Sequence, residues 1–284
     1  MDKKMFCFQC EQTVGCTGCT GNAGVCGKKA DTAKLQDELT GALISLAKAA
    51  DGTETISKRT GQIIIEGLFT TVTNVSFDNA AIENMIQKVR AEKERLVPNC
   101  RTEEYDLQQL WNANEDIRSL KSLILFGIRG MAAYAYHANV LNYEDAEVNR
   151  FFCEALSKIG YEESTEALLS TVLKTGEINL KCMALLDKAN TETYGTPEPT
   201  DVTLTVEKGP FIVVTGHDLK DLQLLLEQTE GKGINIYTHG EMLPAHAYPF
   251  LKKYSHLKGN FGTAWQNQQK EFDHLPAPIL YTTN

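Results

Sequence analysis

The chain has 284 residues, of which 42% are hydrophobic and 23% are charged, and its formal net charge is −9. This composition is typical of a folded globular protein and excludes an intrinsically disordered chain. No apolar run approaches the roughly 20 residues that a membrane-spanning helix needs, and the acidic balance argues against nucleic acid as a partner.

The chain begins with a cysteine-rich segment, residues 1–30, that we expect to be a loop. It contains five of the eight cysteines together with many Gly and Thr residues, and it shows no helical period. A dense group of cysteines at one end of a long chain is typical of a metal site rather than of a disulfide framework. We therefore expect this loop to be wrapped around a metal centre.

The next segment, residues 31–195, is predicted to form an all-α domain. Apolar residues recur there at helical spacing, with Asp31 placed to cap the first helix and Pro98 placed to end the third. Because no part of this segment has a strand pattern, helix bundles are the expected architecture. Four more helices are expected after Pro98, over residues 117–135 and 148–159 and, as two separate helices, around Leu168 and Leu185.

A linker with two prolines, residues 193–201, separates this domain from a predicted α/β domain over residues 202–284. Runs of β-branched residues alternate there with helical patterns, which implies βαβ units and a parallel sheet. Because the chain stops one residue after the last strand, we expect an incomplete α/β domain and a fragment of a longer protein. The expected elements are strands 211–215, 234–238 and 279–283 and helices 219–226 and 246–254.

Four cysteines have a spacing that favours an iron–sulfur site. Cys7 and Cys10 form a CxxC pair, and gaps of eight and then six residues lead to Cys19 and Cys26. A zinc ribbon instead separates two CxxC pairs by about 15–20 residues, so an Fe–S cluster is favoured and structural zinc is the alternative. Cys16 is a fifth candidate, either a free thiol or a substitute ligand.

Two residues of metal-ligating type follow neighbouring predicted strands. His217 comes just after the first strand and Glu241 just after the second. The carboxyl ends of parallel strands meet at one edge of a sheet, so we expect both side chains at a common crevice, with a metal-binding or catalytic role. His239 and His246 flank Glu241 and are expected to be either its supporting partners and proton donors or residues of a solvated loop.

Several long motifs are spread along the whole chain: FCFQCEQT with Cys19 and VCGK, SLILFGIRGMAAYAYHA, VTGHDLKDLQLLLEQTEGKGINIYTHGEMLPAHAYP, GNFGTAWQNQQKEF and ILYTTN. Together they resemble the hybrid cluster protein family, also called the prismane or hydroxylamine reductase family. The resemblance implies a cytoplasmic enzyme. It also implies an N-terminal domain of two three-helix bundles, followed by Rossmann-like α/β domains.

The same resemblance implies an electron-relay cluster at the start of the chain. Cys7, Cys10, Cys19 and Cys26 match the cysteines that hold it. Members of the family carry either a 4Fe–4S cubane or a 2Fe–2S cluster there, and the eight-residue gap resembles the cubane type. A reductase or a ferredoxin would supply the electrons.

A second centre implied by the resemblance is a hybrid Fe–S–O cluster, at which hydroxylamine is reduced to ammonia and water. Nitric oxide is the alternative substrate. His217 and Glu241 match the first two ligands of this cluster, and the cysteine ligands are expected beyond Asn284. We therefore do not expect this chain alone to hold the hybrid cluster. The alternative from another functional class is a non-catalytic module that transfers electrons or is stabilised by zinc.

Overall fold

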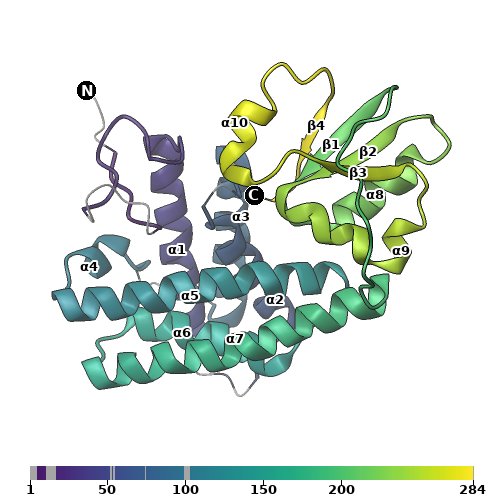
Figure 1. Ribbon diagram of the computed structural model, residues 1–284. Coiled ribbons are helices and arrows are strands. Elements are labelled where there is room, and N and C mark those ends of the chain that lie inside the picture. The colour runs from purple at the N-terminus through teal and green to yellow at the C-terminus, as the bar shows by residue number, and fades with distance from the viewer. Residues whose placement is uncertain are drawn as a thin grey trace. The chain divides into compact units, whose positions relative to one another are not determined.

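The structure is a computed structural model that describes residues 5–10, 17–51, 53, 55–73, 75–98 and 103–283 (Figure 1). The chain divides into two compact units. The first consists of residues 1–139 and 143–186, and the second of residues 140–142 and 187–284. Cys16, Cys100 and Asn284 lie outside the described residues. No helix within the described ranges is long and apolar enough to cross a membrane.

The first unit is helical, and α1 lies against both α3 and α6. Leu168 and Leu185 lie in one continuous helix, so the prediction of two separate helices was wrong; no proline interrupts the segment, and Gly176 is tolerated within the helix. The helices are α1 Ala30–Ala50, α2 Lys58–Thr70, α3 Asn79–Leu96, the unexpected short α4 Leu107–Trp111, α5 Glu115–Val140, α6 Ala146–Gly160 and α7 Thr165–Tyr194, of which α7 continues into the second unit.

The start of α1 differs from the prediction that Asp31 caps it. The helix begins at Ala30, and the residue at the capping position is Lys29, whose side chain makes no capping hydrogen bond. Asp31 lies in the first turn, where its Oδ1 accepts a hydrogen bond from the Thr32 amide at 2.9 Å. Its negative charge still lies at the positive end of the helix dipole, which stabilises the helix without a cap.

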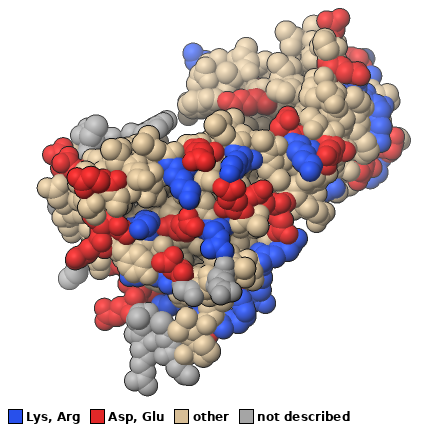
Figure 2. All heavy atoms as spheres, turned by 90° about the horizontal axis from the view of Figure 1, so that it is seen from below, with Lys and Arg blue, Asp and Glu red and all other residues tan. Residues whose placement is uncertain are grey.

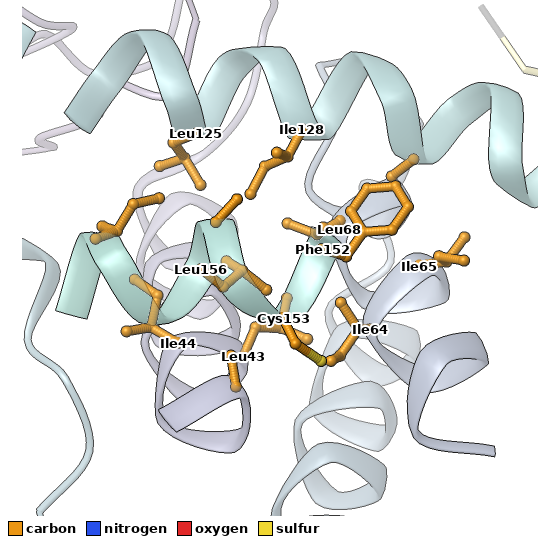
Figure 3. Packing of buried hydrophobic residues seen from close by; sticks show 14 of the residues in the cluster. Leu43, Ile44, Ile64, Ile65, Leu68, Leu125, Ile128, Phe152, Cys153 and Leu156 are labelled. Carbon is orange, nitrogen blue, oxygen red and sulfur yellow. The ribbon is translucent and has the colours of Figure 1, made fainter. Parts of the chain in front are cut away.

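Side chains of α1, α2, α5 and α6 pack together in the core of the first unit, as Figure 3 shows. Phe152 and Cys153 lie among Ile64 and Leu68 of α2 and Leu43 of α1, and all five side chains are almost completely buried. Each large apolar side chain buried in this way stabilises the fold by about 1.5–3 kcal/mol. Burial also raises the pKa of Cys153 to about 12, so this thiol behaves as a small apolar core residue.

A buried carboxylate, Glu92 of α3, connects α2 to α3. It accepts hydrogen bonds from the hydroxyl of Thr60 at 2.7 Å and from Arg95, and its Oε2 lies 3.0 Å from Arg59 Nε. The Arg95 guanidinium, assisted by Thr60 and opposed by burial, lowers the pKa of Glu92 to about 2. Folding therefore stabilises the ionised form of the Glu92 carboxyl relative to its protonated form.

We expect Glu92→Gln to lower the free energy of unfolding near neutral pH by about 2 kcal/mol, because the two arginines lose their charged acceptor. Because the pKa of Glu92 is lower in the folded state than in the unfolded chain, its stabilising contribution is complete above the ordinary carboxyl pKa. The contribution is lost as the pH falls towards the folded-state pKa. The difference between the two proteins should therefore shrink below about pH 4.5 in urea unfolding experiments. Glu83→Gln, at an exposed position of α3, is the control and should change stability by less than about 0.5 kcal/mol. An equal loss in the control would contradict this role of Glu92.

The second unit contains a parallel sheet with the strand order β3-β2-β1-β4. The strand β3 was not predicted, because its sequence LKGNF contains Gly and Asn and no β-branched residue. All three predicted strands are found. The second is shifted by one residue, and the last ends at Tyr281 rather than Thr283. The helix after β1 begins at Leu219 as predicted but continues to Thr229, three residues beyond the predicted end. The elements are β1 Phe211–Thr215, α8 Leu219–Thr229, β2 Asn235–His239, the 3₁₀ helix η2 Gly240–Ala247, α9 Pro249–Lys252, β3 Leu257–Phe261, the 3₁₀ helix η3 Trp265–Asn267, α10 Gln268–Glu271 and β4 Ile279–Tyr281.

Two boundaries in the second unit also differ from the predictions. The linker begins later than expected, because α7 extends to Tyr194 and the extended segment follows it. The helix expected over residues 246–254 is split into the end of η2 and the short α9, with Pro249 at the start of α9. A proline lacks the backbone N–H that would join the two pieces into one helix. Leu222 and Leu226 of α8 are buried in the core below the sheet.

Acidic and basic side chains are interspersed on the surface. Figure 2 shows both kinds next to each other across the face seen from below. Some form ion pairs between helices, such as Lys181 of α7 with Glu147 of α6 at 2.6 Å. Exposed pairs of this kind contribute about 0–1 kcal/mol each, so the fold depends on its cores rather than on these pairs.

Candidate functional site

Four cysteines line one cavity in the first unit. They are Cys7, Cys10, Cys19 and Cys26, and the cavity is also lined by Gln9, Lys28, Met5 and Thr73. The structure thus brings together thiols that lie up to nineteen positions apart in the sequence. Four soft sulfur donors at one cavity match the donor set of an iron–sulfur cluster and equally that of tetrahedral zinc.

A main-chain bridge beside the cavity pairs Cys7 with Cys19. The Cys7 amide donates to the Cys19 carbonyl at 3.1 Å, and the Cys19 amide donates to the Cys7 carbonyl at 2.7 Å. Gly18 precedes this bridge with a φ of +87°, and a Cβ atom there would lie 3.1 Å from the Cys7 carbonyl oxygen. A side chain at this position would therefore strain the backbone and push the two cysteines apart.

The thiols differ in their exposure. Cys7 and Cys19 are buried, whereas Cys10 and Cys26 are half-buried. Burial raises the pKa of Cys7, although the Gln9 backbone amide and the charge of Lys28 act in the opposite direction. Cys7 is therefore a neutral thiol in the metal-free protein, and it would lose its proton on binding a metal. In the ranges that the structure describes, no three His, Cys, Asp or Glu side chains form a group arranged to hold a metal ion.

His217 and Glu241 meet at the carboxyl edge of the sheet. β1 and β2 are adjacent and parallel, with Thr215 opposite His239, so the residues that follow each strand emerge at the same edge. Nε2 of His217 and Oε2 of Glu241 form a hydrogen bond, and both side chains are exposed, by 44% and 57%. A nitrogen and an oxygen donor are thus in contact and accessible to an incoming ligand.

The strand ends around this pair are connected by a second set of hydrogen bonds. Asp218 Oδ2 accepts from both the amide and the hydroxyl of Thr283, at 2.8 and 2.5 Å. The carbonyl of Thr283 in turn lies 3.4 Å from Nδ1 of His217. Because these contacts link the end of β4 to the loop after β1, they restrict the orientation of the His217 ring.

His239 is completely buried beside this edge, so the alternative of a solvated loop was wrong for it. Its Nε2 bonds to Oε2 of Glu271 at 2.8 Å, its Nδ1 bonds to the Thr215 hydroxyl at 3.1 Å, and the Phe272 ring packs against it. His246 is also buried and bonds to the Thr238 hydroxyl at 2.9 Å.

Glu271 is a residue of this region that the sequence did not reveal. It lies in α10, thirty-two positions after His239, and no local pattern connects the two. Burial alone would raise the pKa of Glu271, but hydrogen bonds from Thr263 and His239 outweigh it, and the pKa is lowered. The carboxylate is thus held ionised next to the imidazole. The motif GNFGTAWQNQQKEF contains both Thr263 and Glu271 and was the one available signal.

A family model described as the Prismane/CO dehydrogenase family matches residues 5–284. The chain belongs to the Prismane/CO dehydrogenase family. This family assignment confirms the resemblance that the motifs indicated, and it extends over both units of the chain.

The relatives that match this chain include two proteins named hydroxylamine reductase. The protein from Thermodesulfovibrio yellowstonii is 48% identical over 311 residues, which cover 99% of this chain and 57% of the relative. The protein from Porphyromonas gingivalis is 45% identical over 312 residues, which cover 100% of this chain and 56% of the relative. The chain thus spans little more than half the length of these curated relatives. Among solved structures, carbon monoxide dehydrogenase IV from Carboxydothermus hydrogenoformans matches with a TM-score of 0.34 and 17% identity, covering 95% of this chain and 44% of that chain.

Proposed function

We propose that this chain is part of an iron–sulfur oxidoreductase of the hybrid cluster type, and that the longer protein reduces hydroxylamine to ammonia and water. The observation that carries the proposal is the cavity lined by Cys7, Cys10, Cys19 and Cys26. The relatives named hydroxylamine reductase support the reaction. Nitric oxide is the alternative substrate, and a reductase or ferredoxin is the proposed electron donor.

The four cysteines would hold the electron-relay cluster, which we propose to be a 4Fe–4S cubane, with a 2Fe–2S cluster as the alternative. Such a cluster supplies one-electron transfer when bound. The chain's own contribution is to hold the thiols at one cavity: the Cys7–Cys19 bridge fixes one pair, and Gly24 lies beside Cys26, where an added Cβ atom would be 3.5 Å from the sulfur. Burial of Cys7 and Cys19 keeps water from these two ligands.

His217 and Glu241 would contribute a hard nitrogen and a hard oxygen ligand to the hybrid cluster in the longer protein. Ligands of this type next to sulfide leave weakly held positions on iron, where a small nitrogen–oxygen compound can bind. The reduction of hydroxylamine takes two electrons and two protons, and it breaks the N–O bond. Within this chain, Asp218 and Thr283 orient the His217 ring, and the His239–Glu271 pair holds the end of β2 that leads to Glu241.

The architecture belongs to the same proposal. We propose two three-helix bundles within residues 31–195 and a Rossmann-like domain within residues 202–284, with residues 1–30 as the cluster-binding loop. The helical first unit and the parallel sheet of the second support this division.

Anaerobic metal analysis tests the proposal. The chain should be purified without oxygen, reconstituted with ferrous iron and sulfide, and assayed for iron, acid-labile sulfide and zinc. We expect iron and sulfide in similar amounts, with visible absorption that bleaches on reduction. Stoichiometric zinc without sulfide would support the zinc-stabilised module instead and would contradict the proposal. The hydroxylamine reaction is tested in the full-length protein, with reduced methyl viologen as electron donor and ammonia as the measured product.

A further inference from the structure

A buried arginine lies next to the backbone of the CxxC pair. Arg129 of α5 is only 4% exposed, and its Nη1 donates to the carbonyl of Gln9, between Cys7 and Cys10, at 3.1 Å. Its Nη2 donates to the Thr40 hydroxyl at 2.9 Å, and both of these acceptors are uncharged. Its Nε finds no hydrogen-bond partner among the described residues. Within the described part of the chain, no carboxylate is hydrogen-bonded to this buried guanidinium.

A second buried cation lies beside the same cysteines. Lys28 is 2% exposed, lines the cavity with the four thiols, and donates through Nζ to the neutral amide oxygen of Gln36. Among the residues that the structure describes, neither Lys28 nor Arg129 has a carboxylate bonded to it. A buried cation without a compensating anion is unfavourable, so this arrangement needs a further negative charge to be stable.

One half-buried carboxylate, Asp37 of α1, supplies only part of that charge. It accepts a hydrogen bond from the Gln9 side chain, and burial raises its pKa to about 6 despite the opposing influence of Gln9 and Arg129. Burial lowers the pKa of Arg129 to about 10, while Asp37, Cys7 and Cys10 act in the opposite direction. Within the described residues, the two buried cations act on one carboxylate, Asp37, and the four cysteines are the other groups at the cavity that can become negative.

We propose that Arg129 and Lys28 are the buried positive charges that stabilise the metal-loaded, anionic state of the four-cysteine site and raise its reduction potential. The inference rests on the proposed function, because it requires that these thiols hold an iron–sulfur cluster. A cluster with four thiolate ligands is anionic, and reduction adds one more negative charge. A nearby cation in a low-dielectric interior stabilises the reduced form more than the oxidised form.

A purely structural role for Arg129 makes a different prediction. In that case its hydrogen bonds to Gln9 and Thr40 would hold the loop on α1 and α5, and its charge would not matter. Arg129→Lys keeps the charge and loses the forked hydrogen bonds, whereas Arg129→Met keeps the length and loses the charge. Thr40→Val removes one acceptor and leaves the arginine in place.

The test is an anaerobic redox titration of the reconstituted 284-residue chain, followed by electron paramagnetic resonance, with iron and sulfide measured in every sample. We expect Arg129→Met and Lys28→Met each to shift the reduction equilibrium about tenfold towards the oxidised form, which is ~59 mV more negative for one electron. Arg129→Lys and Thr40→Val should remain close to the wild type. Arg150→Met, which removes an exposed guanidinium from α6, should do so as well.

The outcomes separate this inference from the function on which it rests. A wild-type chain without iron and sulfide would overturn the proposed function and the inference together. A wild type with both, and unchanged potentials in Arg129→Met and Lys28→Met, would overturn only the inference. A shift in Arg129→Lys as large as that in Arg129→Met would favour the hydrogen bonds over the charge and would also overturn it. If Arg129→Met does not take up iron, the potential of Lys28→Met decides the matter by itself.

Discussion

Replacement of Cys10 or Cys19 by serine is expected to abolish the visible absorption of the reconstituted chain. A serine hydroxyl is a much poorer ligand for iron than a thiolate, and neither position can be supplied by another described thiol at the cavity, since Cys7 and Cys26 would already be ligands. Cys19 also takes part in the backbone bridge to Cys7, but serine preserves that bridge because the bonds are made by main-chain atoms.

Absorption spectra together with iron and sulfide analysis measure this effect. Cys153→Ala is the matched control, because Cys153 is buried in the core of α6 and does not line the cavity. It should retain full absorption while it loses some stability through the small cavity left behind. Full absorption and full iron content in both Cys10→Ser and Cys19→Ser would contradict the assignment of these residues as ligands.

The second large effect is expected from Gly216→Ala, at the turn between β1 and His217. Gly216 has a φ of +120°, a backbone conformation that L-residues avoid. A Cβ atom there would lie 2.9 Å from the Thr283 nitrogen and closer still to the Thr283 carbonyl oxygen. Backbone strain and this overlap together should lower the free energy of unfolding by about 3–5 kcal/mol.

Gly209→Ala separates the two contributions. Gly209 has a φ of +138°, but nothing lies within 4 Å of a Cβ atom built on it. It should therefore lose only the strain component, about 1–2 kcal/mol. Urea unfolding measures both variants, and hydrogen exchange of the amides of Thr282 and Thr283 reports on the end of β4. Equal losses in Gly209→Ala and Gly216→Ala would show that the close approach of β4 is unimportant.

Local patterns in the sequence predicted most of the helices and three of the four strands in the described sheet. The run Phe211–Thr215 is rich in β-branched residues, so its strand was evident. β3 was missed because LKGNF becomes a strand only through pairing with β2, which is a tertiary effect. Likewise, Leu168 and Leu185 lie in one helix because no proline interrupts α7 and Gly176 is tolerated within it.

The parts of the candidate sites that could be predicted are those whose residues lie close together in the sequence or follow neighbouring strands. The spacing of Cys7, Cys10, Cys19 and Cys26 is a local pattern, and the meeting of His217 with Glu241 followed from the adjacency of two parallel strands. The partners that surround these residues come from distant parts of the chain. Arg129 reaches Gln9 across 120 positions, and nothing in its own helix distinguishes it from an ordinary arginine.

The position of β4 at the outside of the sheet has a practical consequence for the isolated chain. Among the described strands its one neighbour is β1, and the side chains of Leu280 and Tyr281 are 36% and 55% exposed. An outer strand of this kind offers main-chain donors and acceptors to any extended peptide, including another molecule of the same chain. Self-association at high protein concentration is therefore expected to proceed by β-strand addition, and a peptide that pairs with residues 279–281 should suppress it.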